Sequence, residues 1–479
     1  MIRRLSATYA PLRVPAYRAF LAAQTVSTIG SLVQSTAQAW VAYDITRSPA
    51  ALGMIATLGV IPMVVLGPVA GTLADRFDRR FVLIVTQTAL ALLAAALAML
   101  VQNDAVQAWH LYVLAVLTGA VTALDAPALQ AYAGDLVGAE YVRQAVTLGM
   151  MGFQVSRTLG PPLAGVLVVA VGPASAFWAN AASFLVVAVA VFLLRGVGER
   201  SAPRLGPDLS LDARPPSATS ARAGGMSETI RHVRTNPVLI NLYALPLLYV
   251  FGLASSTLYP AYVRDALHAD ADALGTIIGA WGAGTFATSL VILPLLHGAR
   301  RVGLTCAAAL AWFGAVTVGL GVLGLESVRG TVVGSAWPDV DSIAATLAFL
   351  SGVTGPVVLS QSTGLVQALA PPSMRGRLSG LSGTLNSGLQ PFTNVAVGVS
   401  GEAIGVPATM IGNGAVLLGA VAALVAFRPS VRAPFLSPPL VAVPVRAPAI
   451  PQGARTPSLA SASGTRPPKP SRDAAGESV

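Results

Sequence analysis

Cysteine, lysine and charged residues are scarce in this chain of 479 residues, which argues against disulfides, an ATP-binding phosphate loop and a soluble globular fold. The single cysteine, Cys306, cannot form an intramolecular disulfide, and its apolar surroundings predict a packing role. The only lysine, Lys469, follows Pro468, so no Gly-Lys-Ser/Thr phosphate loop exists and ATP is not expected to act directly. Only 10% of the residues are charged and 54% are hydrophobic, which leaves too little polar surface to cover a soluble globule. The chain is therefore expected to lie in a membrane.

Residue arrangements that support catalysis or metal binding are also missing. The sequence contains no HExxH or GxSxG motif, and no cluster of histidine, cysteine or carboxylate residues has metal-ligand spacing. The histidines fall near the ends of apolar runs or in a polar linker. We expect no enzyme activity, no bound metal and no cofactor.

Apolar runs near or above the roughly 18 to 20 residues needed to cross a bilayer recur along the chain. They are neither as short nor as regularly alternating as barrel strands, so each is expected to be a helix. Residues 1–16 lack a cleavage pattern, so the first span is expected to be an uncleaved anchor. The sequence predicts an all-α membrane protein with twelve transmembrane helices, at residues 17–43, 50–74, 80–101, 107–133, 142–170, 172–195, 237–262, 273–297, 301–325, 341–369, 376–400 and 405–428.

These spans divide into two halves of six, at residues 1–195 and 237–428. A polar linker rich in arginine and proline, residues 196–236, separates them, and its last part is expected to form a solvated connector or a short surface helix. Overlaying the halves at an offset of 233 residues superimposes Leu117 on Leu350 and Gly165 on Gly398, as expected for halves related by an axis along the membrane normal. Residues 429–479 contain eleven prolines and are expected to form a disordered tail.

Basic residues indicate how the chain is oriented. If the N-terminus is cytoplasmic, 26 of the 30 arginine and lysine residues fall in cytoplasmic segments, as the positive-inside rule requires. Both termini are therefore expected to be cytoplasmic. The formal charge of +10 is explained by this topology and by anionic lipid, so no nucleic-acid partner is needed.

A charged loop between the second and third spans reads Gly71-Thr-Leu-Ala-Asp75-Arg76-Phe-Asp78-Arg79-Arg80. It resembles the signature loop of the major facilitator superfamily, with Asp78 where many members have glycine. Further segments resemble the transmembrane secretion effector branch, which includes the enterobactin exporter and macrolide efflux proteins. These segments are Tyr43 to Gly53, Asp125-Ala-Pro127-Ala, Gly160-Pro161-Pro162-Leu-Ala-Gly165 and Arg375-Gly376-Arg377.

The resemblance implies the major facilitator fold and a secondary active exporter of the bacterial-type inner membrane. Such a monomer would move a small amphipathic compound, drug-like or siderophore-like, by alternating access, with proton entry as the coupling reaction. Two alternatives stay open. One is an importer or facilitator of the same fold, although the sugar-porter Pro-Glu-Ser-Pro-Arg signature is absent after the sixth span. The other is a membrane scaffold or lipid-handling protein that keeps the fold without transport.

Two motifs carry the expected gating. By resemblance, Asp75 faces the start of span 11 near Gly376 and closes the inner gate, because a carboxylate is stabilised at a helix N-terminus. The alternative is that these charges only set topology. The exporter-type motif is expected to bend span 5 and pack it against span 8, and a generic kink is its alternative. The residues are Gly71, Asp75, Arg76, Arg79, Arg80, Arg375, Gly376 and Arg377 for the gate and Gly160, Pro161, Pro162 and Gly165 for the exporter-type motif.

Polar residues inside spans suggest the transport path. Spacings of three and four place five polar side chains on one face of span 1, which must line water, bind substrate or bond to a neighbouring helix. In the superfamily, spans 1, 4, 7 and 10 line the central cavity. The resulting cavity candidates are Gln24, Ser27, Ser31, Gln34, Gln38, Tyr249, Ser256, Tyr259, Thr354 and Gln361.

Two charges also lie inside predicted spans, and intramembrane ions are functional by default. Asp125 in span 4 is a candidate proton carrier, and Arg157 in span 5 would tune its pKa by proximity. The alternatives are a structural pair, or an interaction of Asp125 with Arg143 or Arg377 at the membrane interface.

Overall fold

The computed structural model describes residues 9–138, 140–194, 226–296, 301–333, 339–371 and 374–432, with only the backbone described at 68–76, 143, 226, 227, 332, 333, 375, 376 and 379. Within these ranges the chain is almost entirely helical. The first half contains η1 (Ala10–Arg13), α2 (Pro15–Thr46), α3 (Pro49–Arg76), α4 (Arg79–Gln102), α5 (Ala108–Val137), α6 (Val142–Ala170) and α7 (Pro173–Leu193).

The second half follows a short helix, α9 (Met226–Thr235), in the part of the linker where a solvated connector or a short surface helix was expected. Residues 195–225 of the linker and the tail beyond residue 432 lie outside the described residues. The second half contains α10 (Pro237–Leu253), η4 (Ala254–Leu258), α11 (Tyr259–Ala261), η5 (Tyr262–Leu267), α12 (Ala271–Ala287), η6 (Thr288–Ile292), α13 (Leu293–Leu295), α14 (Val302–Leu323), α15 (Glu326–Val333), α16 (Val340–Ser351), α17 (Thr354–Leu369), α18 (Arg375–Ile404), α19 (Val406–Phe427) and α20 (Pro429–Arg432).

Long helical segments occupy all twelve expected span positions, which confirms the all-α membrane fold. In the described part of the chain, nine of them are long and apolar enough to cross a membrane by length and composition alone. The other three, α2, α6 and α18, are less apolar. Their polar groups must find partners inside the protein, because lipid offers none.

Proline interrupts two spans that were expected to be continuous, 237–262 and 341–369. Pro260 has no N–H to donate to the Ser256 carbonyl, and the chain there forms the 3-10 turn η4. Pro356 similarly frees the Gly352 carbonyl at the break between α16 and α17. The Thr285 hydroxyl of α12 donates to that carbonyl at 3.2 Å, so a neighbouring helix supplies the bond that proline removes.

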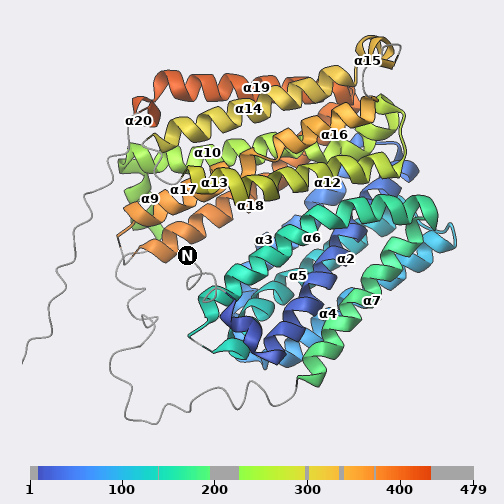
Figure 1. Cartoon of the computed structure of the whole chain (residues 1–479), viewed down its shortest axis with the longest axis vertical. Coiled ribbons are helices and arrows are strands. Elements are labelled where there is room, and N and C mark those ends of the chain that lie inside the picture. The colour runs from blue at the N-terminus through green and yellow to red at the C-terminus, as the bar shows by residue number, and fades with distance from the viewer. Residues whose placement is uncertain are drawn as a thin grey trace, which may run out of the picture. The chain divides into compact units, whose positions relative to one another are not determined.

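The two halves are joined where α6 packs on α12 and α3 packs on α18 (Figure 1). Glycine allows the backbones to touch. A Cβ atom at Gly275 would lie 2.5 Å from the Pro161 carbonyl oxygen, and one at Gly53 would lie 2.4 Å from the Asn394 carbonyl oxygen. Both separations are shorter than real Cβ contacts, so any larger side chain would push the halves apart.

The halves share a core at one end of the helices only. We name the end where α2 turns into α3 the distal end, and the end where α7 finishes and α10 begins the linker end. The largest buried apolar cluster combines first-half residues such as Tyr43 with second-half residues such as Tyr262, toward the distal end. Clusters toward the linker end stay within one half, around Tyr17 in the first and Leu242 in the second. The halves therefore pack together distally and have separate cores near the linker.

Candidate functional site

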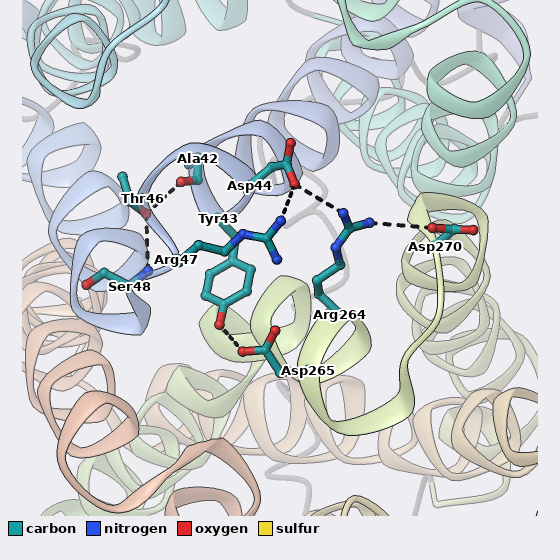
Figure 2. Close-up of polar contacts among 9 residues, drawn as sticks. All are labelled: Ala42, Tyr43, Asp44, Thr46, Arg47, Ser48, Arg264, Asp265 and Asp270. Carbon is teal, nitrogen blue, oxygen red and sulfur yellow. Dashed lines mark hydrogen bonds and ion pairs between the residues drawn. The ribbon is translucent and has the colours of Figure 1, made fainter.

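Charged and polar side chains from both halves meet at the distal end (Figure 2). The Arg264 guanidinium lies 3.3 Å from the Asp44 carboxylate and 3.5 Å from that of Asp270. Arg47 also contacts Asp44, at 3.0 Å, and the Tyr43 hydroxyl donates to Asp265. We name this group the distal cluster: Tyr43, Asp44, Arg47, Arg264, Asp265 and Asp270.

Hydrogen bonds to α18 from Ser48, which precedes α3, and from Thr57 of α3 extend this contact. The Ser48 hydroxyl donates to Glu402 at 2.7 Å, and the Thr57 hydroxyl donates to the Pro391 carbonyl at 3.0 Å. The side chains of Arg264 and Asp44 are 33% and 50% exposed, so their ion pair is worth about 1 kcal/mol or less. A contact built from such weak terms can break and re-form, as a gate must.

A pocket of ≈ 430 Å³ lies at the distal cluster. Its lining mixes cations, such as Arg47 and Arg329, with carboxylates, such as Asp265 and Glu402, and includes His268. Because this pocket contains both cations and carboxylates and lies at an aqueous end of the helices, we expect it to bind neither anionic nor cationic substrates tightly.

A second cavity, of ≈ 220 Å³, lies between the halves within the helical layer. Its polar lining residues are Arg157 from α6, Ser256 and Thr257 from η4, and Gln390 and Asn394 from α18. Trp281 of α12 and the apolar residues Val250, Leu253 and Ala254 complete the lining. We name this space the central cavity. It is a small polar chamber that residues of both halves line.

Proline helps to place the polar groups of the central cavity. The 3-10 turn η4, which Pro260 imposes, turns Ser256 and Thr257 toward the cavity. The Thr257 hydroxyl lies 3.3 Å from the Asn394 side-chain oxygen, so η4 and α18 form one polar wall. On the other wall, the Arg157 guanidinium lies over the Trp281 ring, 4.0 Å from its centroid.

Asp125 lies apart from this cavity. Its buried carboxylate on α5 accepts hydrogen bonds from the Thr86 hydroxyl at 2.5 Å and the Gln87 amide at 2.9 Å, both on α4. The structure thus gives Asp125 and Arg157 separate partners, and no ion pair joins them within the described residues. The expected proximity of the two ions is not seen.

Of the ten predicted cavity residues, Ser256 lines the central cavity. Gln34 instead accepts a hydrogen bond from Asn180 of α7 at 2.7 Å, which is the helix-packing alternative for span 1. Thr354 is buried and donates to the Ala309 carbonyl of α14. Tyr249, Tyr259 and Ser27 are buried, and the Ser31 hydroxyl donates to the Ser27 carbonyl within α2. Three glutamines are half-buried: Gln24, Gln38 and Gln361. Most of these polar side chains contact neighbouring helices and do not line the cavity, and residue spacing within one helix does not show which neighbour a side chain will contact.

The gating motif is described in part. Arg79 binds both oxygens of Asp135 at 2.7 and 2.8 Å, and Arg80 donates to the carbonyls of Val191 and Phe192 at the end of α7. Arg80 therefore caps a helix terminus instead of meeting an acidic group. Arg377 is half-buried. The side chains of Gly71, Asp75, Arg76, Arg375 and Gly376 lie outside the described residues, so the latch stays a prediction.

The residues of the exporter-type motif contact two neighbouring helices. Gly165 lies against the backbone of Asp272 at the start of α12, and Pro162 lies against Gly279. Gly160 faces the other way, toward Leu32 of α2. The motif thus fits α6 between α2 and α12. Its link to export stays a prediction.

Sequence reasoning missed most of the residues that join the halves. Arg264, Trp281, Gln390 and Glu402 were not among the candidate site residues. A signal was present for two cavity residues, because Gln390 and Asn394 are four residues apart and share a helix face. No group of three or more metal-ligating side chains occurs in the part of the chain that the structure describes.

Comparison with known proteins agrees with this architecture. Residues 6–434 match the family described as transmembrane secretion effector. The multidrug efflux pump Tap of Mycolicibacterium fortuitum is 27% identical over 392 residues, covering 78% of this chain and 86% of that protein. The enterobactin exporter EntS of Citrobacter koseri is 26% identical over 369 residues, covering 77% and 80%. An uncharacterized MFS-type transporter of Bacillus subtilis is 28% identical, but the match spans only 63% of its length.

Solved structures share the fold. A bacterial homologue of the human lysosomal transporter Spinster, in an inward-facing and unoccupied conformation, superimposes with a TM-score of 0.64 at 13% identity, covering 88% of this chain and 96% of that one. The nucleoside transporter NupG gives a TM-score of 0.62 at 12% identity, covering 86% and 99%. The family match covers most of the chain, and both structures are transporters. The chain therefore belongs to the transmembrane secretion effector family of the major facilitator superfamily, whose members are multi-pass inner-membrane transporters of small molecules.

Proposed function

We propose that the protein is a secondary active exporter that moves a small amphipathic compound by alternating access, coupled to proton entry. The central cavity, placed between halves that share a core at one end only, is the observation that carries the proposal. A cavity of this kind reaches one side of the membrane at a time if the contact between the halves can move from one end to the other.

The orientation of the chain in the membrane follows from the positions of its arginines. The linker end carries Arg18, Arg79, Arg80 and Arg301, and the positive-inside rule assigns that end to the cytoplasm. The distal cluster then closes the outer side. On this assignment the described conformation is inward-facing, ready to take a substrate from the cytoplasm.

Export is favoured over import by two observations. Relatives with established names are a multidrug efflux pump, an enterobactin exporter and, in Streptococcus pyogenes, macrolide efflux protein A. The segment from Gly160 to Gly165, which resembles the motif of exporters, packs α6 against α12 at the interface between the halves.

Proton coupling is assigned to Asp125. It is a buried carboxylate inside a membrane-spanning helix, and only hydroxyl and amide donors hold it. Such a group is costly to keep charged, so gain and loss of a proton can alternate with helix movement. Protonation would weaken its bonds to Thr86 and Gln87 and loosen α5 from α4.

Transport into inverted membrane vesicles tests the proposal. Export from the cell becomes accumulation in such vesicles, so a panel of drugs and siderophores is added to vesicles that contain the protein or the empty membrane. We expect at least one compound to accumulate when respiration supplies a proton gradient, and an uncoupler to abolish the accumulation. Accumulation that resists the uncoupler contradicts proton coupling. Uptake only in right-side-out vesicles contradicts export and supports the importer alternative.

A further inference from the structure

Arg157 lies near the middle of the 29-residue helix α6 and faces the central cavity. A cation at this depth is costly unless an anion or a set of hydrogen-bond acceptors compensates it. The residues around Arg157 therefore show which interactions of the guanidinium the protein provides and which a ligand could provide.

Among the described residues, Arg157 has an aromatic face beside it and no anion. The Arg157 guanidinium lies over the Trp281 ring, and in the described part of the chain no carboxylate lies within 4.0 Å of it. No hydrogen bond from its five N–H groups to a described side chain or carbonyl is seen, although the buried Tyr249 of α10 lies close enough to interact with it electrostatically. A cation–π contact covers one face of the guanidinium and leaves its edge, where the N–H groups point, without a partner.

Three other described arginines near the ends of the helices have acceptors. Arg79 binds Asp135, Arg264 binds Asp44 and Asp270, and Arg80 binds main-chain carbonyls. Arg157 is half-buried, as these three arginines are, and it lies deeper in the helical layer without a described carboxylate or carbonyl bonded to it. This contrast points to an acceptor that arrives with the substrate.

The rest of the cavity fits an anion. Its other polar lining residues, Ser256, Thr257, Gln390 and Asn394, are neutral, and no aspartate or glutamate is among the lining residues. The buried carboxylate of Asp125 is held elsewhere by Thr86 and Gln87. One cation among neutral dipoles gives the cavity a positive potential.

We infer that the central cavity binds the anionic group of an organic substrate. A carboxylate, sulfonate or phenolate pairs with the Arg157 edge, and an aromatic or apolar part lies along Trp281, Val250 and Leu253. A cavity of ≈ 220 Å³ is smaller than the roughly 300 to 1,000 Å³ of sites for whole drug-sized ligands, so it holds the anionic end and the remainder extends toward the linker end. This inference rests on the proposed transport function and names its substrate class.

Binding of two dyes that share a xanthene ring tests the inference. Fluorescein is anionic and rhodamine 123 is cationic, so they differ chiefly in charge. Fluorescence anisotropy measures the affinity of each for the full chain in lipid nanodiscs. We expect the wild-type protein to bind fluorescein at least about tenfold more tightly than rhodamine 123. Arg157→Gln should weaken fluorescein binding by about 30-fold or more and leave rhodamine 123 binding unchanged or stronger.

Controls separate recognition from folding. Arg157→Lys keeps the charge and should retain part of the preference, whereas Arg18→Gln, which removes an exposed cation from α2, should change neither affinity. Thermal unfolding of each variant shows whether it is folded. Three results would overturn the inference: the wild-type protein binds neither dye up to about 1 mM, it binds the cationic dye more tightly, or Arg157→Gln leaves the fluorescein affinity unchanged. Dye binding needs no proton gradient, so the two experiments are independent. A negative result in the dye-binding experiment does not contradict export, and a negative result in the vesicle experiment does not contradict anion binding.

Discussion

Asp125 and Arg157 both lie inside membrane-spanning helices, yet their surroundings differ. Asp125 is bonded to α4 of its own half, through Thr86 and Gln87. Arg157 lies against Trp281 of the opposite half, and both residues line the central cavity. Bonding within a half suits a group that changes the shape of that half on protonation, and placement between halves suits a group that meets the substrate.

Replacing Asp125 by asparagine tests its role in coupling. Asparagine keeps the size of the side chain and mimics the protonated carboxyl, so Asp125→Asn should remove gradient-driven accumulation in inverted vesicles and leave equilibrium exchange of the compound intact. The matched control is Asp104→Asn, at an exposed loop position whose left-handed backbone (φ 52) asparagine tolerates. Uncoupler-sensitive accumulation by Asp125→Asn at the wild-type rate would remove Asp125 as the proton site.

Asp75 carries the predicted latch at the linker end. If its carboxylate binds the N-terminus of α18 in the outward-facing state, Asp75→Asn removes about 0.3 to 1 kcal/mol or somewhat more from that state. Turnover in vesicles should then fall about two- to tenfold while the amount of inserted protein stays the same. Unchanged turnover would mean that the loop charges only set topology.

Elements are held together by close backbone contact between the halves. A Cβ atom at Gly275 would meet the Pro161 carbonyl at 2.5 Å, whereas one at Gly388 of α18 would have no heavy atom within 4 Å. The same glycine-to-alanine change should therefore have opposite consequences at the two sites, because only the first forces α12 away from α6.

Gly275→Ala should lower the free energy of unfolding by about 1 to 3 kcal/mol through overpacking, and Gly388→Ala should leave it unchanged or raise it slightly, since alanine favours the helix. Thermal unfolding in detergent micelles measures both. Equal stability of the two variants would show that α6 and α12 do not touch as described.

The sequence was informative about elements and less so about their contacts. Apolar length predicted the twelve spans, because a bilayer demands about 20 apolar residues wherever a helix crosses it. The breaks at η4 and before α17 could have been predicted from Pro260 and Pro356. The pairing of Gln34 with Asn180, or of Arg157 with Trp281, depends on which helix faces join over more than a hundred residues of chain. Spacing within one helix does not contain that information.

At the scale of the whole molecule, the contact between the halves determines which side the central cavity can reach. Besides the apolar core that the halves share, its distal part contains ion pairs and hydrogen bonds that are each worth about 1 kcal/mol, with somewhat more for the bond of Tyr43 to the Asp265 carboxylate. Together they amount to a few kcal/mol, the size of the free-energy difference between two states that a ligand can shift. Loss of the distal cluster is therefore expected to shift the balance between the two states, while the shared apolar core contributes the rest of the cost of opening the outer side.

Paired distances between spin labels at the two ends test alternating access most directly. In a Cys306→Ser background, one pair joins exposed positions 103 and 327 at the distal end, and another joins exposed positions 18 and 301 at the linker end. Arg264→Gln combined with Glu402→Gln breaks the distal contacts, and Asp339→Asn, an exposed carboxylate at the same end, is the control.

Our account predicts reciprocal movement. The double variant should lengthen the distal distance and shorten the linker-end distance, while Asp339→Asn changes neither. Distal lengthening without approach at the linker end, or no change at either end, would contradict alternating access between these two halves.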